Sequence, residues 1–374
     1  MIDLTKFTKR IMMTGGFGFI GSHVVRRFVL NHPDYLILNF DKITYAGNPN
    51  NLLDVYNAPN YMIFIGDICD ARVVEEAMSQ FMITDVLHFA AESHVDRSMV
   101  NPTNFVDTNI NGTVNLLEAA KKLWTDGEVH RFINMGTDEI YGSLDVDDAP
   151  FNENTPFDPH SPYSASKTAA VLMAKAYYEA FGLPVINIAC GNAIGPYQFP
   201  EKLVPLVIDR LINNEPIPVY GEGHQMRDWT NVHDIARAMD IILEHGRPGE
   251  MYCLGGDACK RNIDIIRAII CKYAQIVTGV KDGEMATDEM KLKIAELLEL
   301  VTFIPDPRGK AHDFRYDIDH KKATDELRWE PQYTFEDSID EVVRWYLDNQ
   351  HWVKDVKDDN YKKWIDEYYG RMGN

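Results

Sequence analysis

The sequence predicts an α/β protein with a doubly wound parallel sheet and a smaller C-terminal substrate-binding lobe. Three observations predict this class. Apolar runs typical of buried strands recur through the first 190 residues, helical stretches separate several of them, and Pro- and Gly-rich loops replace the pattern from about Gly191. Strands that alternate with helices form parallel sheets. We expect residues 1–190 to form one lobe and residues 191–374 mainly a second, with some later segments returning to the first.

Each element is expected where its periodicity occurs. Short apolar runs predict buried strands at residues 10–14, 35–40, 61–65, 85–90, 131–135 and 184–189. Apolar positions at helical spacing predict helices at residues 21–30, 104–123 and 165–181. A stretch rich in Glu, Lys and Met predicts a solvated surface helix over residues 281–300, with partner binding as the alternative.

Composition bounds the size and the partners. A chain of 374 residues exceeds one typical domain, and its 45% hydrophobic content supports a large core. The formal net charge of −20 argues against nucleic acids and membrane surfaces, because both are polyanions. The negative net charge does not exclude an anionic small molecule as a ligand, since a few local Arg, Lys and backbone N–H groups suffice to hold it.

The five cysteines form no CxxC pair and are odd in number, which favours reduced thiols over a disulfide framework. No metal site is predicted. No apolar run reaches ~18 residues, and the N-terminus lacks the apolar region of a signal peptide. We therefore expect a cytoplasmic protein.

A glycine-rich motif lies between the first strand and the first helix. Gly15, Gly18 and Gly21 have the spacing GxxGxxG, and Asp41 ends the next strand 20 residues after Gly21. Glycines let the backbone approach a pyrophosphate, whose charge meets the helix N-terminus. Asp41 would accept hydrogen bonds from a ribose and repel a 2′-phosphate. This context predicts a Rossmann-type domain that binds NAD rather than NADP; the alternative is an ordinary glycine turn.

Two later strand ends fit the same site. Asp67 and Ile68 would flank the adenine, although a plain loop Asp is the alternative. Phe89, Ala90 and Ala91 would let the cofactor pass close to the backbone because two of the three are small.

Tyr163 and Lys167 lie four residues apart on a predicted helix and so share one face. A phenol has a pKa near ~10 and needs help to act as a base at neutral pH. Lys167 and a positively charged nicotinamide would both favour the tyrosinate. The alternative is a surface Tyr–Lys pair.

Thr137 is followed by two adjacent carboxylates, Asp138 and Glu139. Like charges in a closed site oppose double ionisation, so one carboxyl group can stay protonated as an acid while its neighbour acts as a base. Consecutive strand residues point to opposite faces, so both serve one substrate only if the strand has ended. The alternative is a solvated loop.

On these residues the chain resembles the extended short-chain dehydrogenases/reductases and, among them, the dTDP-glucose 4,6-dehydratase family. The adjacent Asp–Glu after Thr is the specific mark. The similarity runs from about residue 10 to residues 361–364, and its matching segments are residues 41–47, 90–98, 137–142, 161–167, 195–203 and 225–229.

The resemblance implies an NAD-dependent, redox-neutral dehydration that gives a 4-keto-6-deoxy sugar. Tyr163 would take the 4-hydroxyl proton during oxidation at C4, and Thr137 would hydrogen-bond the 4-oxygen. Glu139 would remove the C5 proton, and Asp138 would protonate the departing 6-hydroxyl before hydride returns to C6. Positions matching the family's cofactor site also include Phe17, Phe19, Ile20, Lys42, Thr44, Ser93 and Thr108.

The resemblance also implies a nucleotide-sugar site. Arg227 matches a diphosphate-binding arginine, and the sugar-nucleotide positions are Ser93, Asn192, Glu201, Lys202, Leu203, Pro218, Tyr220 and Asn262. The chain departs from the family at Gly136, usually Ser, and at Ala193-Ile194, where Asn-Tyr is usual. The family's Asp-Arg-Pro-Gly-His-Asp run appears as residues 306–313 with two residues inserted; its candidate ligands are Arg308 and His312.

Four hypotheses remain open at this point. They are dehydration of dTDP-glucose, dehydration of UDP-glucose or another nucleotide sugar, 4-epimerisation, and a non-catalytic NAD-binding sensor or scaffold. An epimerase needs Tyr163 and Lys167 but not the Asp–Glu pair, and a scaffold needs none of them. The resemblance further implies a homodimer through residues 104–123 and 165–181.

Overall fold

The structure is a computed structural model that describes residues 3–125 and 127–357. The part of the family similarity at residues 361–364 lies outside the described residues, as does the end of the predicted second lobe.

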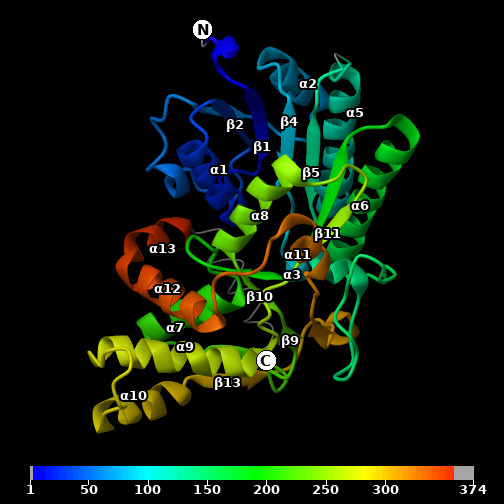
Figure 1. Ribbon diagram of the computed structural model, residues 1–374. Helices are drawn as coiled ribbons and strands as arrows, with labels where there is room; N and C mark the ends of the chain where they lie inside the picture. The colour runs from blue at the N-terminus through cyan, green and yellow to red at the C-terminus, as the bar shows by residue number, and fades with distance from the viewer. Residues whose placement is uncertain (1–2, 126, 358–374) are drawn as a thin grey trace.

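A parallel sheet of seven strands forms the larger part of the protein and confirms the predicted fold class (Figure 1). The strand order is β11-β6-β5-β4-β1-β2-β3, and all neighbouring pairs are parallel. Most of its residues are buried and apolar, as expected for a sheet covered on both faces. Its strands are β1 (Lys9–Thr14), β2 (Tyr35–Asp41), β3 (Tyr61–Ile65), β4 (Asp85–His88), β5 (Arg131–Met135), β6 (Val185–Cys190) and β11 (Met251–Leu254).

Helices cover both faces of this sheet, and each layer buries its own apolar cluster. One layer contains α1 (Phe19–Asn31), α8 (Val232–His245) and α11 (Lys321–Leu327). The other contains α2 (Ala71–Gln80), α5 (Thr113–Leu123) and α6 (Pro162–Phe181). The doubly wound arrangement leaves the carboxyl ends of the strands as the place where ligands bind.

Segments from the second half of the chain join this sheet. Strand β11 pairs with β6, and α8 packs against α1. The division into lobes at residue 190 itself stays a prediction.

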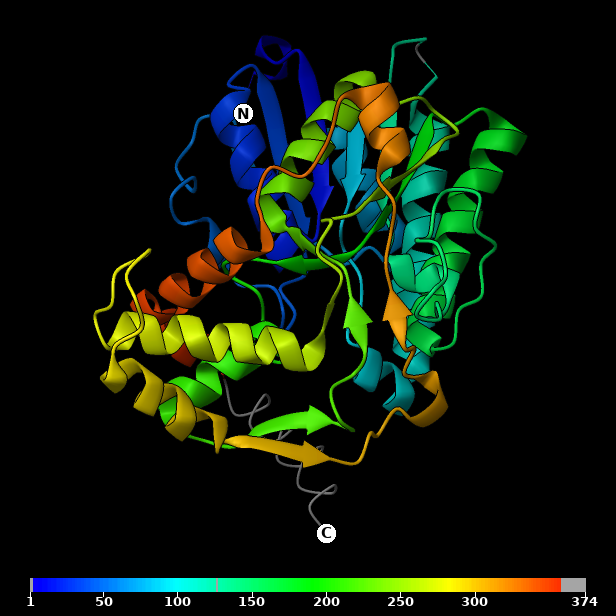
Figure 2. The same ribbon diagram turned by 60° about the horizontal axis from the view of Figure 1, so that its bottom comes forward.

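A smaller helical layer lies beyond the carboxyl ends of the strands (Figure 2). Its cluster joins α7 (Leu203–Asn213), α9 (Asn262–Val277), α10 (Asp288–Leu298), α12 (Phe335–Asp348) and α13 (Gln350–Val356). Short strands lie beside it: β7 (Asn192–Ile194) with β10 (Trp229–Asn231), β8 (Ile217–Tyr220) with β13 (Val301–Ile304), and β9 (Met226–Arg227) between β12 (Lys260–Arg261) and β14 (Arg315–Tyr316).

Two helical predictions need correction. Residues 104–123 are not one regular helix, because a π-helical segment, η3 (Val106–Gly112), separates α4 (Pro102–Phe105) from α5. The predicted helix over residues 281–300 begins only at Asp288. Thr287 caps it, and Gly283 upstream has a φ of +82° that a helix does not allow.

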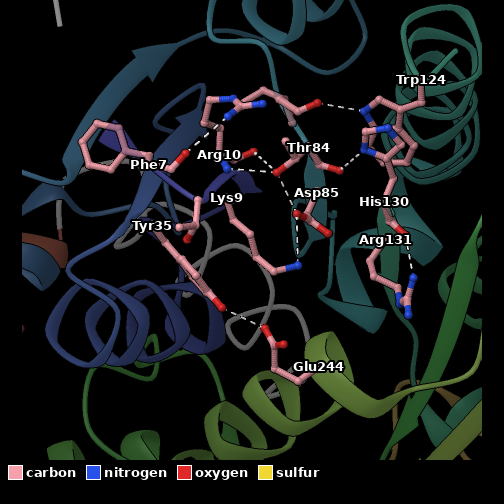
Figure 3. A network of polar contacts seen from close by, with 12 residues as sticks. Phe7, Lys9, Arg10, Tyr35, Thr84, Asp85, Trp124, His130, Arg131 and Glu244 are labelled. Carbon is pink, nitrogen blue, oxygen red and sulfur yellow. Dashed lines mark hydrogen bonds and ion pairs between the residues drawn. The ribbon is translucent and has the colours of Figure 1, made fainter. Parts of the chain in front are cut away.

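The amino ends of the strands carry a buried polar network (Figure 3). Asp85 is fully buried; its carboxylate accepts from the Thr84 hydroxyl at 2.7 Å and lies 3.6 Å from the Lys9 ammonium. His130 contacts the Thr84 carbonyl at 2.8 Å and stacks on Trp124. These contacts satisfy polar groups at strand starts, on the edge opposite the ligand-binding edge.

Among the described helices, none combines the length and apolar character needed to cross a lipid bilayer.

Candidate active site

A cavity open to solvent, with about 1120 Å³ of space between the protein atoms, lies at the carboxyl ends of β1, β2 and β4. Its walls include many of the residues predicted to bind a dinucleotide. Those predicted residues are Gly15, Gly18, Phe19, Ile20, Gly21, Asp41, Lys42, Thr44, Asp67, Ile68, Phe89, Ala90, Ala91, Ser93 and Thr108.

Close backbone packing explains the glycines of the turn. Gly15 has a φ of +71°, and a Cβ there would lie 2.6 Å from the Ala90 amide nitrogen. A Cβ on Gly21 would lie 2.2 Å from the Gly15 carbonyl oxygen. Helix α1 therefore starts tightly against the strand ends, with its free N–H groups toward the cavity.

Asp41 ends β2 at the cavity wall and is held by the backbone. Its carboxylate accepts from the Phe17 amide at 3.0 Å and the Ile43 amide at 2.7 Å, and burial raises its pKa. Phe17 itself is 1% exposed and packs in the core rather than lining the cavity. Its amide donates to Asp41 and its ring packs in the core, so a role of Phe17 as a cofactor contact stays a prediction.

These observations fit a dinucleotide with an unmodified ribose. A Cβ at Gly15 or Gly21 would collide with the backbone of the turn, so only glycine fits there. The N-terminus of α1 favours a pyrophosphate, and the buried carboxylate of Asp41 disfavours a 2′-phosphate.

A second cavity, of about 1060 Å³, adjoins the first. Ser93, Gln198, Glu201 and Lys202 line both, so the two cavities share a wall. Most of the predicted nucleotide-sugar residues line the second cavity, namely Ser93, Asn192, Glu201, Lys202, Leu203, Pro218, Tyr220, Arg227, Asn262, Arg308 and His312.

Three buried amide oxygens of residues that line this cavity lack a partner among the described residues, those of Asn192, Gln198 and Asn262. Asn262 is the first residue of the sixteen-residue helix α9. A ligand with hydroxyl or N–H donors would satisfy such oxygens, and an anionic group suits the helix start.

The segment at residues 306–313, which departs from the family pattern, is tied to the rest of the cavity. Arg308 Nε lies 2.5 Å from Asp96 Oδ1, and His312 Nδ1 lies 2.5 Å from Asp306 Oδ2. Tyr220 donates to Asp96 at 3.3 Å. The insertion therefore still brings Arg308 and His312 to the cavity wall.

The Arg227 guanidinium carbon lies over the ring of Tyr316, 4.1 Å from its centroid. Its terminal nitrogens donate to the carbonyls of Met226, Asp313 and Phe314. The guanidinium is thus fixed at the wall of the second cavity by the backbone.

The acidic pair follows β5, where the strand has ended in a short 3₁₀ turn, η4 (Asp138–Tyr141). Asp138 is 2% exposed, and one of its oxygens lacks a partner among the described residues. Burial and the adjacent Glu139 charge raise the pKa of Asp138 well above its ordinary value. Glu139 lines the second cavity; burial raises its pKa, and Arg308 and Arg227 oppose that rise. The pair therefore favours a protonated Asp138 beside a more easily ionised Glu139.

Thr137, Tyr163 and Lys167 complete the centre and are all buried. The Thr137 hydroxyl donates to Asp138 at 3.3 Å and accepts from the Glu139 amide at 3.3 Å. Lys167 donates to the Met135 carbonyl at 2.5 Å, and burial lowers its pKa to about 8.

Burial and the Glu139 charge raise the pKa of Tyr163, which opposes formation of a tyrosinate. A hydrogen bond with Thr137 opposes this rise. Lys167, one helical turn away, and a cationic ring bound in the first cavity would oppose it further. Thr137, Asp138, Tyr163 and Lys167 lie behind the cavity walls rather than among their lining residues.

Sequence reasoning missed several wall residues. Glu92, Met135 and Gln198 line the first cavity, and Asp96 and Tyr316 line the second. Glu92 and Asp96 belong to the matched segment at residues 90–98, so that segment was the available signal. Neither charge nor periodicity distinguishes Tyr316.

Among the described residues, no group of three or more His, Cys, Asp or Glu side chains is arranged to hold a metal ion.

Comparisons with known proteins agree with this site. The family model described as GDP-mannose 4,6 dehydratase matches residues 12–342. A dTDP-glucose 4,6-dehydratase of Shigella flexneri is 42% identical, over 96% of this chain and 99% of that protein.

Solved structures give the same result. A Bacillus anthracis dTDP-glucose 4,6-dehydratase in complex with NAD is 37% identical, with a TM-score of 0.79 over 94% of this chain and 100% of that one. A Streptomyces venezuelae dTDP-glucose 4,6-dehydratase is 35% identical, with a TM-score of 0.82 over 93% of this chain and 100% of that one. Since these matches span almost the whole chain and the Thr-Asp-Glu and Tyr-Lys residues meet beside a dinucleotide cavity, the chain belongs to the dTDP-glucose 4,6-dehydratase family of extended short-chain dehydrogenases/reductases.

Proposed function

We propose that the protein catalyses the NAD-dependent dehydration of dTDP-glucose to dTDP-4-keto-6-deoxyglucose. The observation that carries this proposal is the acidic pair. A buried Asp138 with a raised pKa lies next to Glu139, which lines the second cavity, and that cavity adjoins the one predicted to bind a dinucleotide. The names of the relatives, whose sequences match over nearly the full chain, support dTDP-glucose as the substrate.

The first cavity holds the cofactor in this proposal. The glycine turn receives the pyrophosphate, and Asp41 receives the adenosine ribose. When bound, NAD supplies the acceptor for the hydride from C4 and the donor of that hydride to C6.

Oxidation at C4 depends on Tyr163. As a tyrosinate, it takes the proton of the 4-hydroxyl, while Lys167 stabilises the phenolate from one turn along α6. Thr137 contributes a hydroxyl that hydrogen-bonds the 4-oxygen and keeps it aligned.

Elimination uses the acidic pair in opposite protonation states. The new ketone acidifies the C5 proton, and Glu139 removes it. Asp138, protonated because burial and Glu139 disfavour its ionised form, donates to the 6-hydroxyl as the C6–O bond breaks and water leaves. Glu139 then returns a proton to C5 as C6 is reduced.

The second cavity binds the nucleotide. Arg227, Arg308 and Lys202 bring three cations to it, which suits a diphosphate. Asn192 and Asn262 present oxygens for sugar or base donors.

A second candidate is dehydration of UDP-glucose or another nucleotide sugar. It is favoured by the inserted segment at residues 306–313, because Arg308 and His312 reach the nucleotide cavity from an altered loop. Epimerisation and a non-catalytic scaffold are less compatible, since neither requires Asp138 and Glu139.

The test is direct. The purified protein is incubated with dTDP-glucose and, separately, with UDP-glucose, and the sugar products are identified by mass and NMR. Loss of one water with a 4-keto product supports dehydration, and faster turnover of dTDP-glucose supports the proposed substrate. Intact mass with inverted C4 would identify an epimerase. No turnover of either sugar nucleotide would exclude the proposed substrates.

We also infer that the protein acts in the cytoplasm as a homodimer. All five cysteines are free thiols. Helix α6 exposes Leu172 (48%) and Phe181 (57%), and η3 exposes Val106 (45%), so the predicted dimer helices present apolar side chains. Light scattering should give twice the chain mass, and Leu172→Glu should shift the protein toward monomer. An unchanged dimer in that variant would move the interface elsewhere.

A further inference from the structure

Three segments far apart in the sequence meet at Glu201. Tyr45, in the loop after β2, donates to Glu201 Oε1 at 3.3 Å. Arg97, in α3 (Val95–Val100), donates from Nε to Glu201 Oε2 at 3.1 Å. The Arg97 guanidinium also lies 4.0 Å from the centroid of the Tyr45 ring. We call Tyr45, Arg97 and Glu201 the clasp.

The ion pair of the clasp, between Arg97 and Glu201, is largely shielded from solvent. The Glu201 side chain is 2% exposed and that of Arg97 is 23% exposed. His94 Nε2 lies 3.9 Å from Glu201, but burial lowers the pKa of His94 to about 4, so this imidazole is neutral. The charge of Lys202 also interacts with Glu201, but Arg97 is the cation that forms the ion pair with it, so the loss of Arg97 would leave a buried carboxylate with much weaker compensation.

The clasp joins two segments of the wall of the cofactor cavity that are far apart in the sequence. Thr44 and Ala46, on either side of Tyr45, line that cavity, and so do Glu201 and Lys202. Neither Tyr45 nor Arg97 belongs to the lining of either cavity. Tyr45 and Arg97 therefore act on the cavity through Glu201, which does line it.

We infer that Tyr45 and Arg97 are positioning residues that retain NAD through turnover by holding residues 42–47 against residues 198–202. This inference rests on the use of NAD in the proposed function. The hydride taken from C4 must return to C6 of the same sugar. If the reduced cofactor left between these steps, the electrons would leave with it and the unsaturated keto sugar would remain. By holding the wall that the two cavities share, the clasp would keep NAD in the first cavity while sugar nucleotide exchanges through the second.

The experiment measures dissociation of radiolabelled NAD into excess unlabelled NAD, with no sugar present. Arg97→Gln removes the countercharge and should raise the dissociation rate about 10- to 100-fold. Tyr45→Phe removes one hydrogen bond and should raise it about fivefold. Tyr45→Leu also removes the contact of the ring with Arg97 and should exceed Tyr45→Phe by a further factor of about two to five.

Arg26 supplies the matched control. It is 18% exposed, pairs with Asp54 at 2.6 Å and lies 5.1 Å from the ring centroid of Tyr197, but it does not line the cofactor cavity. Arg26→Gln should leave NAD dissociation within twofold of the unmodified protein. Equal acceleration in Arg97→Gln and Arg26→Gln would overturn the clasp, as would unchanged dissociation in all Tyr45 and Arg97 variants.

Two features keep the test decisive. If Arg97→Gln fails to fold, Tyr45→Phe still decides, because it deletes a single hydroxyl. Since no sugar is present, the outcome is independent of the substrate. A protein that turns over no sugar nucleotide would disprove the proposed function while leaving NAD retention measurable.

Discussion

Two buried aspartates lie at opposite edges of the same sheet. Asp85, at the amino edge, is fully buried, and Asp138, at the carboxyl edge, is 2% exposed. Each has one carboxyl oxygen without a partner among the described residues, and burial raises the pKa of each. By burial, pKa direction and unpaired oxygens, the two are alike.

Their neighbours differ. Asp85 has the Lys9 ammonium at 3.6 Å and a Thr84 hydroxyl bond, and these oppose the rise of its pKa. Asp138 has the Glu139 carboxylate as its strongest charged neighbour, which adds to the rise. A carboxyl group with a raised pKa therefore indicates catalysis only when the neighbouring charges also disfavour its ionised form and a cavity lies beside it.

The largest expected effect is that of Asp138→Asn. The amide keeps the shape but cannot donate a proton as an acid, so dehydration should fall about 10³-fold. Because burial and the Glu139 charge favour the neutral form of Asp138 in the folded protein, the melting temperature should change little. The measurement is kcat for dehydration together with thermal unfolding. A variant with more than a tenth of normal activity would remove Asp138 from the acid role.

Glu139→Gln should separate the two halves of the reaction. Oxidation at C4 should still occur and be visible as absorbance of reduced cofactor, while exchange of the C5 proton with solvent should fall about 10²-fold. Deuterium incorporation at C5, measured by NMR in D₂O, checks this. Unchanged overall turnover would exclude Glu139 as the base.

Lys167 predicts opposite trends of activity and stability with pH. Its pKa of about 8 means that the ammonium is lost as pH rises through that value, so kcat should fall about fivefold between pH 8 and 9. The unfolded-state pKa is about 10.4, so the folded state binds fewer protons between these values and stability should rise with pH there. Melting temperatures of the native protein and of Lys167→Met test this: the rise should vanish in the variant. A variant that kept the rise would assign it to another group.

The smallest effect is expected for Asp85→Asn, the matched counterpart of Asp138→Asn. Activity should stay within twofold. The raised pKa of Asp85 means that its stabilising contribution is lost as pH rises through that pKa, so a neutral amide should change the unfolding free energy at pH 7 by at most about 1 kcal/mol. Denaturant unfolding measures this. A large loss of activity would contradict the comparison, because it would show that neighbouring charges do not distinguish a catalytic carboxyl group from a structural one.

The sequence allowed six of the seven strands of the sheet and the position of the glycine turn to be predicted because each depends on local order. Gly15 to Gly21 lie between a strand and a helix, and Asp138-Glu139 follow a strand end, as expected from their spacing. The roles of Asp138 and Glu139 came from the family resemblance and stay predictions. The π-helical segment at Val106–Gly112 and the late start of α10 at Asp288 depend on backbone details that apolar periodicity does not encode.

Long-range contacts were beyond reach for a different reason. Tyr45 and Glu201 are 156 residues apart, and Asp96 and Arg308 are 212 apart. In the sequence each is an ordinary polar residue in a loop or short helix. Glu201 was assigned to the sugar nucleotide, and only the folded chain reveals that Arg97 and Tyr45 take up both of its oxygens.

Strand β11 has a consequence for synthesis. It is the edge strand beside β6, yet it comes from Met251–Leu254, so about two thirds of the chain must be made before the sheet is complete. Until then β6 presents open hydrogen-bonding groups to the surroundings. A growing chain is therefore exposed to wrong pairing for the time needed to make some sixty residues, and a nascent-chain chaperone has most to offer in that interval.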